Sequence, residues 1–175
     1  MDFTIRPITK DDEPFLWQML YYASHVDEEG ATSPEDAKNN PDLAKYVKDW
    51  GRPTDMGFLA LDPHTQQLIG AAWVRLLIGP DKTISYIDDS TPELAIAVLP
   101  EYIGKGLGTQ LLTHVLQAAG HTFPAVVLSV RSTNPARRLY EKLGFVIVSE
   151  SVNRVGTGSF NMIARSDHDY KRFAT

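Results

Sequence analysis

The sequence predicts one α/β (α+β) domain over residues 1–175, with a mixed sheet flanked by helices. A strand-like segment is followed by two helical segments and a hairpin, and the second half of the chain alternates strands with helices. No linker, internal repeat or low-complexity segment interrupts this order, and 175 residues fit a single domain. The expected strands are residues 3–8, 58–61, 68–77, 94–98, 125–130, 145–148 and 159–164.

The first quarter of the chain reads as an edge strand followed by helices. Residues 3–8 alternate in polarity, and Pro7 places this strand at or near an edge of the sheet. Acidic residues at 11 and 12 suit the start of a helix, and residues 27–32 read as a polar loop. The apolar face of this first helix is Phe15, Leu16, Met19, Leu20 and Ala23.

A second helical region and a hairpin follow. Ser33 suits the cap of a helix, Pro41 interrupts it, and a further helical piece through Leu43, Tyr46, Val47 and Trp50 ends at residues 51–53. Strands 58–61 and 68–77 then form a hairpin around residues 62–64. Residues 84–91 show no clear pattern, so they are left unassigned.

The segment from residue 94 to residue 116 combines a strand, a glycine-rich turn and a helix. The apolar run 94–98 has the length of a strand, residues 103–108 read Ile-Gly-Lys-Gly-Leu-Gly, and the following helix has one apolar face. Backbone N–H groups at such a helix N-terminus bind anions, so this turn predicts an anion cradle. Its spacing matches neither the dinucleotide fingerprint nor the P-loop, which disfavours a nucleotide-binding module.

Residues 134–145 read as a short helix that stops sharply and leads into a strand. Asn134 suits the N-cap and Pro135 the first helical position. Gly144 suits a left-handed residue at the end of the helix, and residues 146–152 are expected to pair with the last strand, before a polar tail from Asp167. The helix face is Ala136, Leu139, Tyr140 and Leu143.

Composition narrows the class of protein. The formal net charge is −5, so no nucleic-acid partner is expected, and no apolar run is long enough to span a membrane. No signal peptide is recognisable, and the chain has no cysteine, which fits a cytoplasmic protein without disulfides or thiolate metal sites. The five histidines form no metal-binding motif, so no metal is expected.

The two motifs together resemble the GNAT superfamily of acetyl-CoA-dependent N-acetyltransferases. The family loop, Gln/Arg-x-x-Gly-x-Gly/Ala, aligns with residues 103–108, where Ile103 replaces the usual Gln or Arg. The second family motif aligns with Asn134, Tyr140, Gly144 and Phe145 in the matching order. The resemblance implies a mostly antiparallel sheet splayed into a V, with the coenzyme in the cleft.

The resemblance also implies which residues contact the coenzyme. Backbone N–H groups of the glycine loop would hold the pyrophosphate, and the pantetheine arm would lie along the central strand as an added strand. Asn134 would hydrogen-bond that arm besides capping its helix. The side chains of Lys105 and Arg137 could either contact the coenzyme or point into water. The expected contacts are Ile96, Val98, Gly104, Lys105, Gly106, Gly108, Thr109 and Asn134.

Two side chains are implied to act on the reaction. Tyr140 would protonate or hydrogen-bond the thiolate that leaves when an amine attacks the thioester. Glu93, at the start of the central strand, would accept the proton of the amine; Asp88 and Asp89 are alternatives, and an amine that arrives neutral needs none of them. The family transfers acetyl directly to the amine, without an acyl-enzyme.

The acceptor is a primary amine of a small molecule or of a protein, and the sequence does not identify it. An alternative is a non-catalytic domain that binds acetyl-CoA as a sensor or partner. A homodimer is left open, because many members of the family are dimers. Residues placed near the acceptor pocket by this resemblance are Trp17, Tyr21, Tyr22, His25, Asp27 and Glu28.

Overall fold

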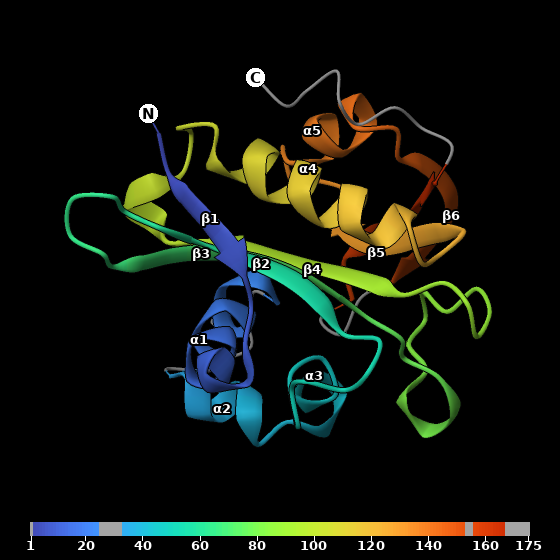
Figure 1. The fold of residues 1–175 in the computed structure, drawn as a ribbon. Coiled ribbons are helices and arrows are strands. Elements are labelled where there is room, and N and C mark those ends of the chain that lie inside the picture. Colours follow the sequence, from blue (N-terminus) through green and yellow to red (C-terminus); the bar gives the residue numbers. More distant parts are fainter. Residues whose placement is uncertain (1, 25–32, 153–155, 167–175) are drawn as a thin grey trace.

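The strands form one sheet between two helical layers in the computed structural model, which describes residues 2–24, 33–152 and 156–166. Helices α1, α2 and α3 cover one face of the sheet, and α4 and α5 cover the other (Figure 1). In chain order, the elements are β1 Thr4–Pro7, α1 Glu13–Ala23, α2 Pro34–Lys38, α3 Pro41–Ala44, β2 Met56–Leu61, β3 Leu68–Arg75, β4 Glu93–Val98, α4 Leu107–Gly120, β5 Ala125–Arg131, α5 Arg137–Lys142, β6 Val146–Val152 and β7 Gly158–Arg165.

The first four strands form an antiparallel meander. β1 is the edge strand predicted from Pro7, and β2 and β3 form the predicted hairpin, with Gly57 opposite Trp73. β4 continues the meander beside β3, with Trp73 opposite Ala95. The predicted strands of this half of the chain are therefore confirmed.

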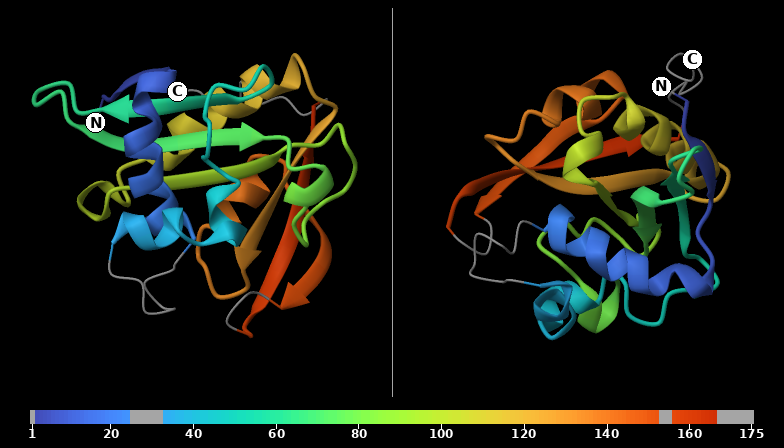
Figure 2. Two further views of the ribbon diagram at one scale, coloured as in Figure 1. Left: turned by 90° about the horizontal axis from the view of Figure 1, so that it is seen from below. Right: turned by 90° about the vertical axis from the view of Figure 1, so that its left-hand side faces the viewer.

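The strand pairing changes from antiparallel to parallel between β4 and β5. These two strands are parallel and share a single register pair, Glu93 opposite Val127. Beyond that pair they separate, and β5 continues into an antiparallel group in the order β5-β7-β6. Figure 2 shows the strands of residues 125–165 running at a steep angle to those of residues 56–98. The expected mixed, mostly antiparallel, splayed sheet is confirmed.

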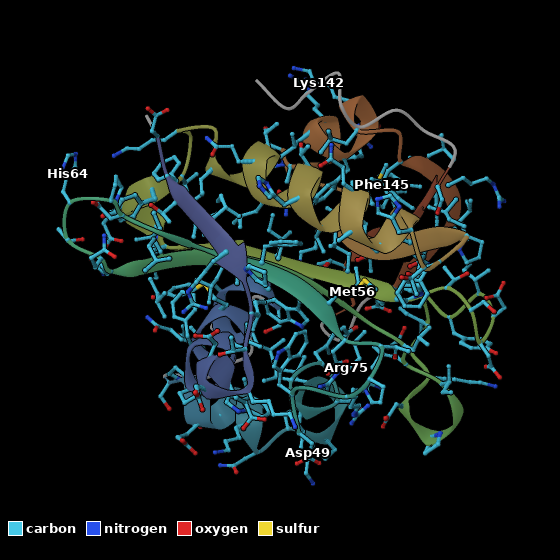
Figure 3. The ribbon with its side chains drawn as sticks, in the orientation of Figure 1. Asp49, Met56, His64, Arg75, Lys142 and Phe145 are labelled. Carbon is cyan, nitrogen blue, oxygen red and sulfur yellow. The ribbon has the colours of Figure 1, made fainter. Side chains whose placement is uncertain are left out.

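Helix α4 packs its apolar face onto the sheet. Leu111, Leu112, Val115 and Leu116 are all buried, and the helix contacts β2, β3, β4 and β5. Because α4 touches strands of both groups, it holds them together on the face opposite α1. Side chains fill the space between the sheet and both helical layers, with Arg75 lying toward α3 (Figure 3).

Two predicted helix boundaries are wrong. The helical piece expected through Trp50 is helical only over α3, and residues 45–49 form turns in which Asp49 has φ +58°. The apolar spacing reflected burial instead, because Leu43, Val47 and Trp50 are all in the core. The C-terminal helix also begins later than expected, with Ala136 as its N-cap in place of Asn134.

The remaining predictions have mixed outcomes. Ser33 caps α2 and Gly144 has the expected positive φ of 97°. Residues 84–91 contain neither helix nor strand. The expected loop at 27–32 and the tail from Asp167 lie outside the described residues.

Candidate active site

A cleft of about 910 Å³ opens where β4 and β5 separate. Its walls are the facing edges of these strands, and its ends are the glycine loop before α4 and the turn before α5. The single pair between Glu93 and Val127 lies at the apex of the V. The cleft therefore exposes two strand edges and a helix N-terminus to the same space.

The glycine loop presents backbone donors to this cleft. Gly104 and Gly106 both have φ +81°, and a Cβ atom added to either would meet nothing within 4 Å. No described residue accepts a backbone hydrogen bond from the N–H groups of residues 104–109. Since Gly106 is the N-cap of the 14-residue helix α4, these groups form the positive end of its dipole. The arrangement suits a phosphate group.

The loop's other residues take different positions. Gly108 and Thr109 line the cleft in the first turn of α4. Ile103 also lines it, with 68% of its surface exposed. Lys105 does not, and its ammonium lies 5.3 Å from the ring centre of Tyr102. Ile103 thus offers the cleft an apolar side chain at the position where a polar one is usual.

Strand β4 forms one wall. Ile96 and Val98 line the cleft and pair with Ala72 and Gly70 of β3 on the opposite edge. On the β5 side, no described strand pairs with β4 beyond Glu93. Backbone groups of this edge can therefore bind an extended ligand in the way that a strand binds a strand.

Asn134 lies at the mouth of the cleft. Its side-chain oxygen accepts a hydrogen bond from the Ala136 N–H at 2.9 Å, which stabilises the turn leading into α5. The side-chain amide N–H₂ group remains the part of Asn134 that can donate to a ligand. Arg137 instead interacts with Glu141, at 3.5 Å, and with the ring of Phe160, at 5.1 Å.

Tyr140 reaches the cleft from α5. The residue is buried, with 8% of its surface exposed, and its ring makes a T-shaped contact with that of Phe145, the ring centres lying 5.9 Å apart. Burial raises the pKa of the phenol to about 12, so the hydroxyl is protonated at neutral pH. None of the described residues hydrogen-bonds to that hydroxyl, which leaves it available as a donor.

Glu93 lies at the apex of the V with its carboxylate buried. Thr83 donates a hydrogen bond to Oε1 at 2.6 Å, and the hydroxyl of Tyr46 donates one to Oε2. Burial raises the pKa of Glu93, while the two hydroxyls and the nearby Lys45 act in the opposite direction. Burial has the largest effect, so the pKa of the Glu93 carboxyl is higher than that of an exposed one, and its affinity for a proton is greater.

The two alternative carboxylates lie elsewhere. Asp88 and Asp89 are exposed and do not line the cleft. Asp88 accepts hydrogen bonds from the Ser90 N–H and the Thr91 hydroxyl, which lower its pKa, and Asp89 accepts one from Tyr86 at 2.6 Å. Of the three carboxylates, only Glu93 faces the cleft.

Sequence reasoning missed Tyr46 and Thr83. Tyr46 is 47 positions from Glu93, and a tyrosine at helical spacing carries no signal of such a contact. Among the predicted acceptor residues, Tyr22 lines the cleft, whereas Tyr21 packs against Tyr22 and Trp17 is in the core beneath Lys38. The other three, His25, Asp27 and Glu28, lie outside the described residues.

Neither a metal site nor a membrane-spanning helix occurs among the described residues. Among them, His, Asp and Glu side chains nowhere gather in threes around a space that could hold a metal ion. The described helices include none with the length and apolar character needed to cross a membrane.

The amino-acid sequence is similar to those of known acetyltransferases. The model of the acetyltransferase (GNAT) family matches residues 15–145. The chain is 27% identical over 139 residues to the 5-NmdU N-acetyltransferase of Pseudomonas phage PaMx11, covering 73% of this chain and 92% of that protein. It is 34% identical over 115 residues to the mycothiol acetyltransferase of Acidimicrobium ferrooxidans, covering 65% of this chain and 34% of that one.

Solved structures share the fold. A chimera of the Vibrio cholerae spermidine N-acetyltransferase SpeG and hSSAT superposes with a TM-score of 0.67 at 20% identity, covering 99% of this chain and 98% of that one. The aminoglycoside acetyltransferase AAC(6')-Ib in complex with coenzyme A gives 0.63 at 19% identity, covering 94% and 95%. At sequence identities of 19–20%, the similarity to these two structures shows a shared fold and nothing more.

Proposed function

The chain belongs to the acetyltransferase (GNAT) family and transfers acetyl from acetyl-CoA to an amine, and we propose that Glu93 and Tyr140 perform the proton transfers of this reaction. The predicted family, cosubstrate and enzyme class are thereby confirmed. The alternative of a non-catalytic sensor is not favoured, because the family and both curated relatives are acetyltransferases. The single observation that carries the proposal is that both side chains face one cleft beside the glycine loop.

Acetyl-CoA would bind along the length of this cleft. Its pyrophosphate would receive hydrogen bonds from the free N–H groups of residues 104–109, including that of Lys105. Its pantetheine arm would lie against Ile96 and Val98, with Asn134 donating to it from the mouth of the cleft. The apolar side chain of Ile103 leaves pyrophosphate binding to the backbone.

The amine would approach from the apex side of the thioester. Glu93 would take the proton that makes the amine an ammonium ion at neutral pH. The amine nitrogen then forms a bond to the acetyl carbon, the carbon–sulfur bond breaks, and nitrogen releases its second proton to solvent. Glu93 also passes the proton that it took to solvent, which restores the base. Tyr140 would hydrogen-bond the departing thiolate or protonate it, and would regain its own proton from water. No covalent enzyme intermediate is required.

The acceptor would be a primary amine, on a small molecule or on a protein. Among the described residues, the cleft is lined by one carboxylate, Glu93, and by several tyrosines, including Tyr22 and Tyr46, which suits a cation before it loses its proton. A cytoplasmic location, a homodimer and a single domain over residues 1–175 stay predictions.

Coenzyme binding and turnover test this proposal together. Acetyl-CoA is titrated calorimetrically into the wild type and Gly106→Trp, in which the new ring should fill the cradle. Gly79→Trp is the matched control, since Gly79 also has a positive φ and an open Cβ position but lies outside the cleft. Binding should disappear only in Gly106→Trp, and equal binding by all three proteins would reject the site.

Turnover is then measured as thiol release with a panel of spermidine, kanamycin, an aminomethyl nucleoside and a lysine peptide. Because the chain has no cysteine, the assay detects only released coenzyme A. Glu93→Gln and Tyr140→Phe should bind acetyl-CoA but turn it over slowly. Wild-type turnover in both variants would reject the proposed roles.

A further inference from the structure

Tyr46 contacts the carboxylate that the proposed reaction uses. Its hydroxyl donates to Oε2 of Glu93, while Thr83 donates to Oε1 at 2.6 Å. The two donors come from separate segments, the turn after α3 and the loop before β4, and each hydrogen-bonds a different oxygen of the carboxylate. A carboxylate has about four lone-pair positions. Two are used here, and the others remain for a proton from the cleft.

The segment that carries Tyr46 is fixed to the sheet through its backbone. The Trp73 indole N–H donates to the Tyr46 carbonyl at 3.0 Å. Arg75 donates to the carbonyls of Lys45, at 3.1 Å, and of Lys48, at 2.7 Å. Three carbonyls within four residues are thus held by two side chains of β3.

Arg75 is itself held rigidly. Its guanidinium forms a bidentate ion pair with Asp55, at 2.8 and 3.0 Å, and both side chains are almost fully buried. The guanidinium also lies 5.4 Å from the ring centre of Trp50. The position of the Tyr46 hydroxyl therefore derives from β3, the strand directly beside Glu93.

From this arrangement we propose that Tyr46 is a positioning residue for Glu93, orienting the carboxylate so that its free lone pairs face the acceptor amine. The inference rests on the proposed role of Glu93 as the base. Without the Tyr46 hydroxyl, the hydrogen bond from Thr83 would hold only Oε1, and the carboxylate could rotate about it. Tyr46 acts through Glu93, so its effect is distinct from that of a residue that contacts the reacting atoms.

The same contacts set the charge environment of Glu93. The groups that face it are the hydroxyls of Tyr46 and Thr83 and, at longer range, the Lys45 ammonium. Arg75 stands opposite it on β3 but is paired with Asp55. Each hydroxyl stabilises the ionised carboxylate and lowers its pKa against the effect of burial. Removing the Tyr46 hydroxyl should therefore raise the pKa of Glu93 further.

The first measurement needs no acceptor. The Glu93 side-chain carboxyl carbon is titrated by ¹³C NMR in the wild type, Tyr46→Phe, Thr83→Val and Thr83→Ser, with Glu93→Gln to assign the resonance. Tyr86→Phe is the matched control, because Tyr86 makes the same kind of bond to Asp89 on the surface. Glu93 should titrate at higher pH in Tyr46→Phe and Thr83→Val, and as in the wild type in Thr83→Ser and Tyr86→Phe. An unchanged titration in Tyr46→Phe would overturn the proposal.

The second measurement is the pH profile of thiol release with the accepted amine of the panel, beginning with spermidine. In Tyr46→Phe the acid limb of kcat should move to higher pH together with the NMR titration. Turnover at a fixed pH on that limb should fall about tenfold for each pH unit that the limb moves, with the KM for acetyl-CoA unchanged. Because Phe keeps the buried part of the ring, Tyr46→Phe should still fold, and thermal unfolding beside the wild type checks this.

The outcomes separate this inference from the proposed function. Wild-type kinetics in Tyr46→Phe, together with loss of turnover in Glu93→Gln, would overturn the role of Tyr46 alone. Wild-type turnover and an intact acid limb in Glu93→Gln would overturn the base itself, and the positioning role with it. If Tyr46→Phe has a much lower melting temperature than the wild type, Thr83→Val is compared with Thr83→Ser. That pair tests whether a hydroxyl hydrogen bond orients the Glu93 carboxylate.

Discussion

Arg75 and Glu93 stand directly opposite each other on β3 and β4, yet their charges do not pair. The guanidinium turns to Asp55 and to two backbone carbonyls, and the carboxylate accepts hydrogen bonds from two hydroxyls. A paired arginine would hold the pKa of Glu93 well below its usual range. Because Arg75 is committed elsewhere, burial dominates and the pKa is raised, which keeps Glu93 suited to accept a proton.

Replacing Arg75 should strongly destabilise the fold. Arg75→Met leaves the carboxylate of Asp55 buried without its cation, and the free energy of unfolding should fall by about 3–5 kcal/mol. Urea unfolding followed by circular dichroism measures this. Arg52→Met is the control, because its pair with Asp81 spans 3.7 Å and is partly exposed, so its loss should cost at most about 1 kcal/mol. Equal losses in the two variants would contradict the importance assigned to the buried pair.

The raised pKa of Glu93 predicts a pH-dependent cost to stability. A carboxyl whose pKa is higher in the folded state contributes stability below its unfolded pKa, about 4.3, and loses that contribution as the pH rises through the folded pKa. Glu93→Gln does not titrate, so its stability relative to the wild type should increase as the pH rises. Urea unfolding of both proteins from below about pH 4 to neutral pH measures the difference in their free energies of unfolding. A difference independent of pH would show that folding leaves the pKa of Glu93 unchanged.

Tyr140→Phe should slow the reaction without changing how it depends on pH near neutrality. The phenol is protonated there, because its pKa is about 12. Loss of its proton should lower kcat by roughly 10²-fold, while calorimetry should give wild-type affinity for acetyl-CoA. A loss of affinity equal to the loss of turnover would instead make Tyr140 a binding residue.

Gly108→Ala separates a folding role of this glycine from a ligand-binding one. A Cβ atom here would lie 3.5 Å from the Leu139 side chain, an ordinary contact, so the fold should be unchanged or more stable by up to about 1 kcal/mol. If coenzyme passes over the first turn of α4, acetyl-CoA should bind about tenfold more weakly, the equivalent of one hydrogen bond. Gly120→Ala, at the other end of the same helix, should leave affinity unchanged. Unaltered binding in Gly108→Ala would place the coenzyme elsewhere.

The strands were predictable because their signals are local. Alternation, apolar runs of strand length, strand-like composition and a turn signal between two strands located the strands, and Gly144 ended its helix in the left-handed conformation that glycine favours. The start of α5 was less certain, because Asn134 caps a turn at 2.9 Å from the Ala136 N–H before the helix begins. The single pair between Glu93 and Val127 leaves no mark on either strand, and the splay was expected only from the family resemblance.

The candidate site was predictable to a lesser degree. Motif spacing identified the glycine loop and Tyr140, both of which face the cleft. Choosing among Glu93, Asp88 and Asp89 required knowing which carboxylate lies at the apex of the V, which depends on the register of β4. The contact of Tyr46 with Glu93 could not be predicted from the sequence, because side chains of β3 that lie far from Tyr46 in the sequence set its position.

Among the described residues, the edges of β4 and β5 that face the open V have no partner strand beyond the pair Glu93–Val127. Unpaired edges of this kind are templates on which other chains can add and aggregate. An acetyl-CoA molecule lying along β4 would occupy one of them and would also stabilise the fold by mass action. Resistance of the enzyme to unfolding, aggregation and proteolysis would then rise with the concentration of its own cosubstrate.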